Sequence, residues 1–345
     1  MTGSGTDVVA LGSLHLDVMV RARALPRLGE TMAGDAVAFE PGGKGGNQAV
    51  AAARHGARVA MIGAIGRDAF GGMLRTHLSA NGVDVSHVAE HDGVASGMSI
   101  AVTEPAGDYA AIIVSGANSQ LGALSPDASA LIGGARWLML QNEVLDAANL
   151  AAASAAFAAG CRVILNAAPA RTAPPGLTAM VDVLVVNAVE AEDLSGIAVI
   201  DVASARAAAT ALCRDVACAI VTAGGDGLAL ARNGACTSFP AHRVVVLSTH
   251  GAGDMFVGAL AARLAAGDRI EAAARYANAA AALWVATPVA MRGAIKPADV
   301  ARLLAEALPA ALDYPDAAAP PVSTTGLSAD QLGPATLARS LCQGL

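Results

Sequence analysis

The sequence predicts an α/β fold with a mostly parallel central sheet, helices on both faces of that sheet, and a small β-sheet lid. Short apolar runs without polar alternation recur along the 345 residues, and Ala-rich segments of helical pattern separate them. Strands of a parallel sheet give such runs because helices cover both of its faces. Two segments without a helical pattern interrupt this order, and they predict the lid.

Six apolar runs are the predicted central strands. They are residues 7–13, 58–66, 136–141, 162–166, 181–187 and 217–225. The predicted helices include 47–55, 147–159, 202–213, 252–266, 270–286 and 297–307. Ligands of open parallel sheets bind beyond the carboxyl ends of the strands. We therefore expect functional residues just after the apolar runs.

The lid is predicted from residues 16–40 and 95–115. The second segment contains "SGMSIAVTEPAGDYAAIIVS", which is typical of a hairpin with its turn at 105–108. From residue 314 onward the composition shifts to Pro, Ser, Thr and Ala. We expect one domain over 1–312 and a flexible C-terminal tail over 313–345.

Charge and composition exclude several classes of protein. The net charge is −7 and the 22 Lys and Arg residues are scattered singly, which argues against a nucleic-acid partner. No uncharged apolar run reaches the roughly 18 residues of a membrane span. The cysteines are Cys161, Cys213, Cys218, Cys236 and Cys342. Their odd number and the absence of a C-x-x-C pair predict buried, unreactive thiols in a cytoplasmic protein, without a zinc site.

An acidic residue follows a small-residue stretch at the start of the predicted helix 252–266. In "STHGAGDMFVG", Gly251, Ala252 and Gly253 stand directly before Asp254. Glycines let the backbone approach a ligand closely, and N–H groups at a helix start bind phosphate oxygens. A carboxylate beside such a site is suited to taking a proton from a hydroxyl that attacks phosphorus. Asp254 is therefore a candidate base, and a helix cap is the alternative interpretation.

A second glycine-rich stretch, "PGGKGGNQA" at 41–49, surrounds one of the two lysines of the chain. It is not a Walker P-loop, because the spacing before the Gly-Lys pair differs. Lys44 and Asn47 could donate hydrogen bonds to substrate hydroxyls. A tight strand-to-helix turn is the alternative interpretation.

Two further motifs follow predicted strands. "NAVE" places Asn187 and Glu190 on one helix face, where their oxygens could hold hydrated Mg²⁺ or could cap the helix. "TAGGDG" at 222–227 is a glycine-rich turn suited to nucleotide contact, and an ordinary hairpin turn is the alternative.

Together these motifs resemble the ribokinase family of phosphofructokinase-B-type carbohydrate kinases, over about residues 6–310. The most specific marks are "GAGDMF" and "GGKGGNQA", and the second leans toward ribokinase within the family. "LGSLHLD", "LPRLGET", "LNAAPAR" and "NAVEAEDLSG" also match. The resemblance implies a three-layer αβα sandwich, a lid that often pairs two subunits into a homodimer, and a kinase that uses ATP and Mg²⁺.

The resemblance also implies roles for individual residues. Asp254 would be the base on a primary sugar hydroxyl, and the catalytic set would be completed by Gly251, Ala252 and Gly253, with the N–H groups of residues 252–254 as an anion hole. Asn187 and Glu190 would hold Mg²⁺ through water. The nucleotide-binding residues would be Asn187, Thr222, Gly224, Gly227 and Asn278. The sugar-binding residues would be His15, Asp17, Gly43, Lys44, Asn47 and Glu143.

Three departures from the family pattern alter these expectations. Ser248 stands where members usually carry an Asp that helps to hold an activating monovalent cation, so we expect little response to K⁺. The segment 287–294, "TPVAMRGA", is longer than the one that usually completes that cation site. His15 stands where ribokinases usually carry Asn, and its larger ring could change which sugar fits. A hydrogen-bonded neutral imidazole at the lid hinge is the alternative interpretation.

The function expected from these residues is an ATP-dependent sugar kinase acting on ribose or a similar pentose. A nucleoside kinase of the same fold and a non-catalytic sugar or nucleotide sensor are the alternatives. The Gly-Gly-Lys-Gly-Gly-Asn run favours a free sugar because it predicts a tight polar pocket. The presence of Asp254 beside an anion hole argues against a sensor.

Overall fold

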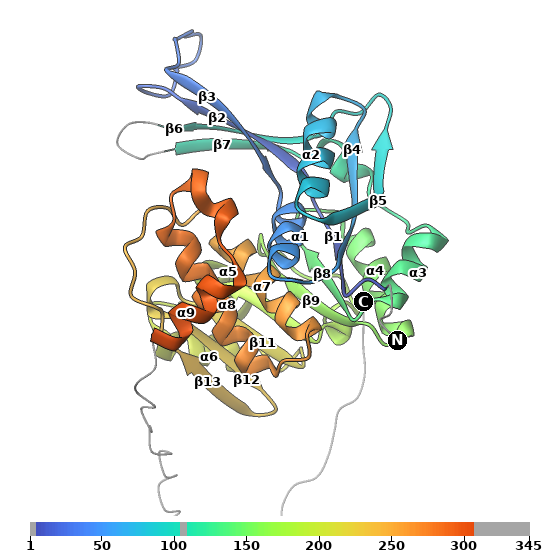
Figure 1. Ribbon diagram of the computed structural model, residues 1–345, viewed down its shortest axis with the longest axis vertical. Helices are drawn as coiled ribbons and strands as arrows, with labels where there is room; N and C mark the ends of the chain where they lie inside the picture. Colours follow the sequence, from blue (N-terminus) through green and yellow to red (C-terminus); the bar gives the residue numbers. More distant parts are fainter. Residues whose placement is uncertain (1–4, 104–108, 307–345) are drawn as a thin grey trace, which may run out of the picture. The chain divides into compact units, whose positions relative to one another are not determined.

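The central sheet of the computed structural model has nine strands within the described residues, 5–103 and 109–306. Its strand order is β13-β12-β11-β10-β9-β8-β1-β4-β5 (Figure 1). The strands are β1 (Val8–Leu11), β4 (Val59–Gly66), β5 (Val83–His91), β8 (Trp137–Gln141), β9 (Arg162–Asn166), β10 (Val183–Asn187), β11 (Cys218–Thr222), β12 (Leu228–Arg232) and β13 (Ala235–Phe239). Strands from β11 to β5 pair in parallel, whereas β12 and β13 are antiparallel. The expected mostly parallel sheet is confirmed.

All six apolar runs form central strands, but three strands were not predicted. β5 lies at the sheet edge, where one face meets solvent, so its residues alternate between polar and apolar and give no continuous run. β12 and β13 form a hairpin whose turn has Asn233 at φ 52° and Gly234 at φ 77°. The Asn-Gly pair is a known signal for such a hairpin and was available in the sequence.

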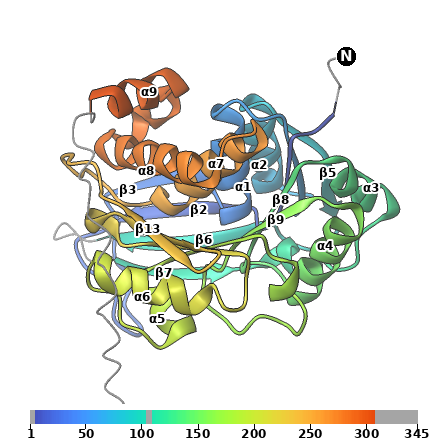
Figure 2. The same ribbon diagram turned by 90° about the horizontal axis from the view of Figure 1, so that it is seen from below.

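Helices cover both faces of the sheet (Figure 2). One layer contains α1 (Lys44–Arg54), α2 (Ala69–Ala80), α7 (Ala252–Ala265), α8 (Ile270–Ala286) and α9 (Pro297–Glu306), and the other contains α3 (Pro126–Gly134), α4 (Asp146–Ala159), α5 (Ala188–Ser195) and α6 (Val202–Leu212). Each layer packs on its side of the sheet through a separate cluster of buried apolar residues. The three-layer αβα sandwich is therefore confirmed. Helices α2 and α3 were not among the predicted elements, and α5 was implied only by the helix face given to Asn187 and Glu190.

A separate sheet of four strands forms the lid, in the order β3-β2-β6-β7. Its strands are β2 (His15–Arg21), β3 (Ala36–Gly42), β6 (Gly97–Thr103) and β7 (Tyr109–Val114). β6 and β7 pair antiparallel, as the predicted hairpin within 95–115 required, and β2 pairs antiparallel with β3 and in parallel with β6. The turn predicted at 105–108 lies outside the described residues.

The two faces of the lid differ in composition. Val18, Phe39, Ile100 and Ile112 are aligned across the four strands and therefore share one face. The opposite face carries Asp17, whose carboxylate accepts a hydrogen bond from Ser99 Oγ at 2.5 Å and lines a cavity between lid and body. The lid thus turns its polar face toward the cavity.

The thiols are more exposed than expected. Burial raises the pKa of the Cys161 thiol to about 11 and of the Cys218 thiol to about 12. Cys213 and Cys236 are only partly buried, so the expectation of burial is wrong for these two. None of these four forms a disulfide, and Cys342 lies outside the described residues, as does the tail predicted over 313–345.

One further expectation concerned membrane spans. Within the described ranges, none of the helices combines the length and the apolar character that crossing a bilayer requires.

Candidate active site

Polar residues end four neighbouring strands of the central sheet. They are Gln141 on β8, Asn166 on β9, Asn187 on β10 and Thr222 on β11. The strand register pairs Gln141 with Asn166, and Asn187 with Thr222. These side chains therefore gather at one edge of the sheet, where parallel sheets bind ligands.

The start of α7 lies at the same edge and carries Asp254. Gly251 precedes the helix at φ 75°, a backbone conformation that glycine adopts without a steric penalty. The N–H of Ala252 donates to Thr249 O at 3.1 Å. Among the described hydrogen bonds, none uses the N–H groups of Gly253 or Asp254, which leaves both free for an anion at the positive end of the helix dipole.

Two amides from α1 hold the Asp254 carboxylate. Asn47 Nδ2 donates to Oδ2 at 3.1 Å, and Gln48 Nε2 donates to Oδ1 at 3.0 Å. Gln48 also donates to Asn166 Oδ1 at 3.0 Å, and its own oxygen accepts from Gln141 Nε2 at 2.9 Å. This buried amide chain connects the carboxylate to the ends of β8 and β9 and fixes its orientation.

Small residues let α1 and α7 approach closely enough for these contacts. Gly258 follows Asp254 by one helical turn, and a Cβ added there would lie 2.4 Å from Ala51 Cβ and 2.6 Å from Gln48 O. Real Cβ atoms do not come so close, so the contact requires glycine. The Ala-rich sequence of α1 and Gly258 of α7 together bring the Asn47 and Gln48 amides to the carboxylate.

Burial raises the pKa of Asp254, while Lys44 and the two amides oppose the shift and Glu143 adds to it. A carboxylate with a raised pKa is a stronger base than an exposed one, provided that the pH keeps it ionised. The position, the two hydrogen bonds and the raised pKa of Asp254 suit a proton acceptor.

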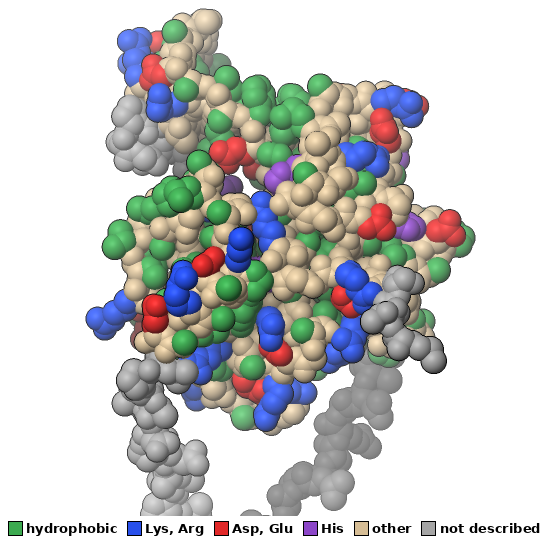
Figure 3. Space-filling view, viewed as in Figure 1, with side chains coloured by type: hydrophobic (Ala, Val, Ile, Leu, Met, Phe, Trp, Pro, Cys, Tyr) green, Lys and Arg blue, Asp and Glu red, His purple; other side chains and the backbone are tan. Residues whose placement is uncertain are grey.

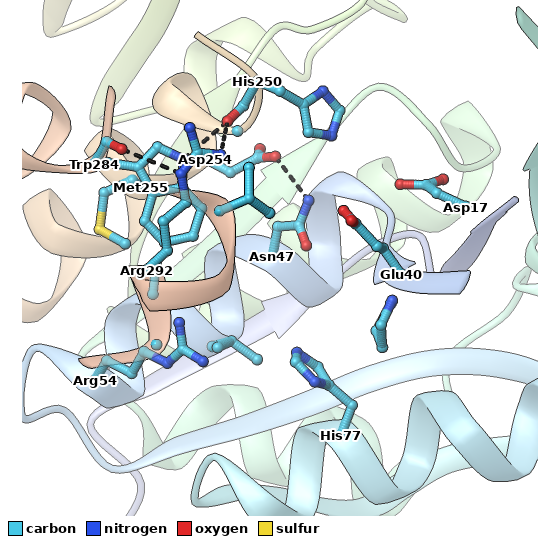
Figure 4. Close-up of a pocket in the computed structure, with 16 residues that line it drawn as sticks. Asp17, Glu40, Asn47, Arg54, His77, His250, Asp254, Met255, Trp284 and Arg292 are labelled. Carbon is cyan, nitrogen blue, oxygen red and sulfur yellow. Dashed lines mark hydrogen bonds between the residues drawn. The ribbon is translucent and has the colours of Figure 1, made fainter. Parts of the chain in front are cut away.

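Three cavities adjoin at Asp254 and the start of α7. The first, of about 220 Å³, lies between lid and body, and Asp17, Glu40, Asn47, His250 and Asp254 are among its lining residues (Figure 4). The second, of about 160 Å³, shares Asp254 with the first and contains Lys44, Asn187 and Glu190. The third, of about 420 Å³, shares Thr222, Ala252 and Gly253 with the second. Asp254 thus stands between the first two, and Gly253 between the last two.

The first cavity has a mixed lining, in which carboxylates and an amide stand beside apolar residues such as Val50 and Met255. Glu143 lines another cavity, of about 320 Å³, together with His15. Glu143 Oε2 accepts from Ser13 Oγ at 2.5 Å and from Lys44 N at 2.9 Å. Figure 4 shows Asp17 and Glu40 of the lid strands on the same cavity as Asn47 and Asp254. Carboxylates and amides can each bind adjacent hydroxyls, so this lining suits a polyol.

His15 is 4% exposed at the first residue of β2. Its Nδ1 lies 3.9 Å from Glu143 Oε2, and its Nε2 has no hydrogen-bond partner among the described residues. Burial lowers its pKa, although Glu143 and Asp17 oppose the shift. The ring is therefore neutral at neutral pH, and its Nε2 is buried without a described partner.

Gly43 acts through the backbone. It precedes α1 at φ 85°, and a Cβ added there would lie 2.7 Å from His15 N. Only glycine lets the start of α1 lie against the end of the β1–β2 connection.

Asn187 and Glu190 form the capping arrangement that was the alternative interpretation. Asn187 Oδ1 accepts from Glu190 N and Glu190 Oε2 accepts from Asn187 N, both at 2.9 Å. The cap uses one oxygen of the Glu190 carboxylate and leaves the other free for a ligand. Burial raises the pKa of Glu190, with Lys44 opposing. No described group of three or more His, Cys, Asp or Glu side chains could hold a metal, so any ion would keep most of its water here.

The third cavity has a mainly apolar lining with few polar groups. Gly224, Gly227, Asn278, Ala281 and Val285 are among its lining residues. Such a lining is typical of pockets that take a flat aromatic ring system. The Asn278 side chain is fixed because its Nδ2 donates to Pro240 O at 2.8 Å.

The surface around the site carries no large area of one charge. On the face seen in Figure 3, Lys and Arg side chains lie singly among Asp and Glu side chains. Acidic, basic and histidine side chains lie close together where the lid meets the body.

The sequence interpretation missed several residues of this site. They are Ser13, Glu40, Gln48, Gln141, Asn166 and Arg292. Gln141 and Asn166 had a usable signal, since each is the polar residue that ends an apolar run. Gln48 lay inside a motif already singled out, but its contact with Asp254 spans 206 positions of sequence and depends on the fold.

Comparison with known proteins shows which family the chain belongs to. Residues 5–296 match the model of the pfkB family carbohydrate kinases. The chain belongs to this family. The expected resemblance is therefore confirmed, over almost the whole segment from which it was predicted.

Individual relatives agree with the family assignment. The chain is 32% identical to ribokinase of Haemophilus influenzae over 280 residues, which cover 81% of this chain and 92% of that protein. It is 33% identical to ribokinase of Mus musculus over 263 residues, covering 75% and 81%. The structure of Arabidopsis thaliana ribokinase complexed with ribose and ATP superposes with a TM-score of 0.82 at 29% identity, covering 87% of this chain and 99% of that one.

Proposed function

We propose that the protein is an ATP-dependent kinase that transfers the γ-phosphoryl group to a hydroxyl of ribose. The observation that carries the proposal is the Asp254 carboxylate, held by two amides between the first cavity and the free N–H groups of a helix start. The relatives named ribokinase and the solved complex with ribose and ATP support the substrates.

In the proposed reaction, Asp254 takes the proton of the sugar hydroxyl as its oxygen attacks the γ-phosphorus. A new O–P bond forms, the bond from the γ-phosphorus to the β,γ-bridging oxygen breaks, and ADP leaves with that oxygen. The N–H groups of Gly253 and Asp254 bind the oxygens of the transferring group, where negative charge accumulates. The sugar would lie in the first cavity, with Asp17 and Asn47 binding its other hydroxyls.

ATP occupies the third cavity and extends into the second. The adenine would lie beside Asn278 on α8, and the phosphates would pass Thr222, Gly224 and Gly227 to reach the start of α7. Position 227 requires glycine, because its φ is 107° and an added Cβ would lie 2.1 Å from Phe239 O. This tight turn would let the backbone approach the phosphates closely.

Asn187 and the free carboxylate oxygen of Glu190 line the second cavity and would hold Mg²⁺ there through water. When bound, the ion would neutralise charge on the phosphates. The protein's own contribution is the half-buried Glu190 carboxylate, which the capping box holds in one orientation.

Glu190→Gln is expected to raise the Mg²⁺ concentration for half-maximal rate by about 10-fold, as for outer-shell ligands of other metals. Gln retains the capping box, so α5 stays folded. Rate against Mg²⁺ at fixed ATP measures the effect. Glu192→Gln, an exposed change on the same helix, is the control. Equal Mg²⁺ requirements for both variants and the unmodified protein would remove Glu190 from the ion site.

The apolar face of the lid supports a homodimer. Val37, Phe39, Ile100 and Ile112 on this face are between 39% and 67% exposed. A contiguous exposed apolar surface of this kind is typical of a protein–protein interface. We extend the proposal to a dimer in which two lids pack through these faces.

Ile112→Asp is expected to convert the dimer to a monomer, because it would bury an unpaired charge in the interface. Analytical ultracentrifugation over a range of protein concentrations measures the effect. Phe157→Asp is the matched control, because Phe157 on α4 is 68% exposed and Ile112 is 67% exposed. A monomeric unmodified protein, or a dimer that both variants retain, would contradict lid pairing.

The proposed substrates are tested by measuring ADP formation across a panel of free pentoses, hexoses and nucleosides. We expect the highest kcat/KM with ribose. A clear preference for nucleosides would replace the sugar kinase by a nucleoside kinase. Binding without any turnover would indicate a sensor.

A further inference from the structure

A guanidinium group lies among backbone carbonyls behind the start of α7. Arg292 belongs to the short helical turn η4 (Val289–Ala294) and is 4% exposed. Its nitrogens donate to four backbone oxygens. These are Trp284 O at 3.2 Å and Thr287 O at 3.3 Å from Nε, His250 O at 3.0 Å from Nη1, and Ser248 O at 2.8 Å from Nη2. Figure 4 shows the Arg292 side chain between Trp284 and His250.

Carbonyl oxygens, not carboxylates, surround this buried charge. Among the described residues, Arg292 has no ion pair within 4.0 Å. Burial lowers its pKa and the charge of Glu40 opposes this, but a guanidinium stays protonated. The Trp284 ring adds a cation–π contact, 4.8 Å from the guanidinium carbon to the ring centroid. Converging carbonyl dipoles of this kind are the environment that a bare monovalent cation takes.

The guanidinium connects two segments that form the site. Ser248 and His250 lie in the loop that leads into Gly251 and the free N–H groups of α7, while Trp284 and Thr287 end α8. Trp284 Nε1 also donates to His250 O at 2.8 Å. Arg292 therefore fixes the loop that positions the anion hole, and it places a positive charge behind it.

We propose that Arg292 is a tethered cation that takes the place of a monovalent metal ion in positioning the phosphate-binding loop. Two observations agree on this point. Ser248 brings no carboxylate to the position that would neutralise a metal ion, and the convergent carbonyls already accept hydrogen bonds from the guanidinium. The proposal rests on the kinase function for its rate measurements, and it makes Arg292 a positioning residue.

Ser248→Asp alone is not expected to create K⁺ activation. A carboxylate at 248 would pair with the guanidinium rather than admit K⁺. The double variant Ser248→Asp, Arg292→Ala removes the tethered charge and supplies a carboxylate, and it is the variant expected to respond to K⁺.

The decisive variant is Arg292→Ala, assayed with and without millimolar guanidinium at fixed ionic strength. Loss of loop positioning is expected to lower kcat on the order of 10²-fold, and guanidinium should restore it saturably. The unmodified protein should keep its rate when a large organic cation replaces K⁺. Arg292→Lys keeps the charge with fewer donors and should lie between the two.

A binding measurement tests the site independently of turnover. The chain has two tryptophans, so Trp137→Phe leaves Trp284 as the only one. In that background, guanidinium should shift the Trp284 fluorescence of the Arg292→Ala variant saturably and should not shift that of the protein with Arg292. This titration keeps its meaning even if no sugar is phosphorylated, so failure of the kinase proposal is distinguishable from failure of this one.

Arg75→Ala is the matched control, because Arg75 also donates to backbone oxygens, Val85 O at 3.3 Å and Val88 O at 2.9 Å, away from the site. It should keep its rate and show no guanidinium effect.

Saturable K⁺ activation of the unmodified protein would overturn the proposal. An Arg292→Ala variant that keeps the full kcat would also overturn it. So would an Arg292→Ala variant in which guanidinium changes neither kcat nor the Trp284 fluorescence. If the alanine variant does not fold, an Arg292→Lys variant that folds but loses kcat as fully as Asp254→Asn overturns it, and one that retains rate without K⁺ supports it.

Discussion

Asp254→Asn is expected to lower kcat by about 10²–10⁴-fold, the usual contribution of a general base, while ATP still binds. Asn has nearly the same shape, so the fold of α7 and the anion hole should persist. It cannot accept the hydroxyl proton, however, and its amide N–H₂ would face the donating amide of either Asn47 or Gln48. Steady-state kcat and calorimetric ATP affinity together separate the loss of the base from the loss of the site.

The pH dependence gives a second check on the same carboxylate. Burial raises the pKa of Asp254, so the carboxylate takes up a proton at a higher pH than an ordinary aspartate does. As the pH is lowered, kcat of the unmodified protein should therefore begin to fall at a pH above the ordinary aspartate range. The residual rate of Asp254→Asn should lack this limb. A variant that keeps more than about a tenth of the unmodified kcat would show that Asp254 is not the base, since that is well outside the range for such a group.

Gly253→Ala is expected to lower kcat/KM on the order of 10²-fold with no loss of stability. A Cβ at this exposed position meets no heavy atom within 4 Å, and its φ is not positive, so the backbone accepts alanine. Removing a glycine from a compatible position raises unfolding free energy by about 0.4–1 kcal/mol. The methyl group would nevertheless stand where the second and third cavities meet, in the proposed path of the transferring phosphoryl group.

Gly72→Ala on α2 is the control for this substitution. An added Cβ there also meets nothing within 4 Å, so the same change in helix propensity occurs at a residue that lines none of the three cavities. Thermal unfolding should rise in both variants, and kcat/KM should fall only in Gly253→Ala. Unchanged kcat/KM in both would show that the phosphoryl group does not pass this point.

The central sheet was predictable because its strands are buried on both faces, and burial leaves a direct mark on sequence. The runs that became β1, β8 and β10 are continuous apolar segments. β5 escaped because an edge strand is half exposed, and α2 because its apolar residues are few and two glycines interrupt its helical pattern. Local sequence reports burial well and reports position at a sheet edge poorly.

The site was predictable where residues sit in local motifs and not where the fold joins distant segments. Asp254 and Lys44 stood out among glycines, whereas Gln48 contacts Asp254 only because Gly258 lets two helices meet. Arg292 is the clearest case. The segment 287–294 was noted for its length, but convergence of four carbonyls on one guanidinium follows from the packing of α8 against the 248–251 loop.

The most direct test of the proposed chemistry is to identify the product formed from ribose and ATP by phosphorus and carbon NMR. We expect equal amounts of ADP and of a sugar phosphate whose phosphorus is bonded to the primary hydroxyl oxygen, as the family resemblance implies, and neither product from Asp254→Asn at the same protein concentration. ADP without sugar phosphate, or phosphate on a secondary or anomeric oxygen, would contradict the assignment of Asp254 as the base for a primary sugar hydroxyl.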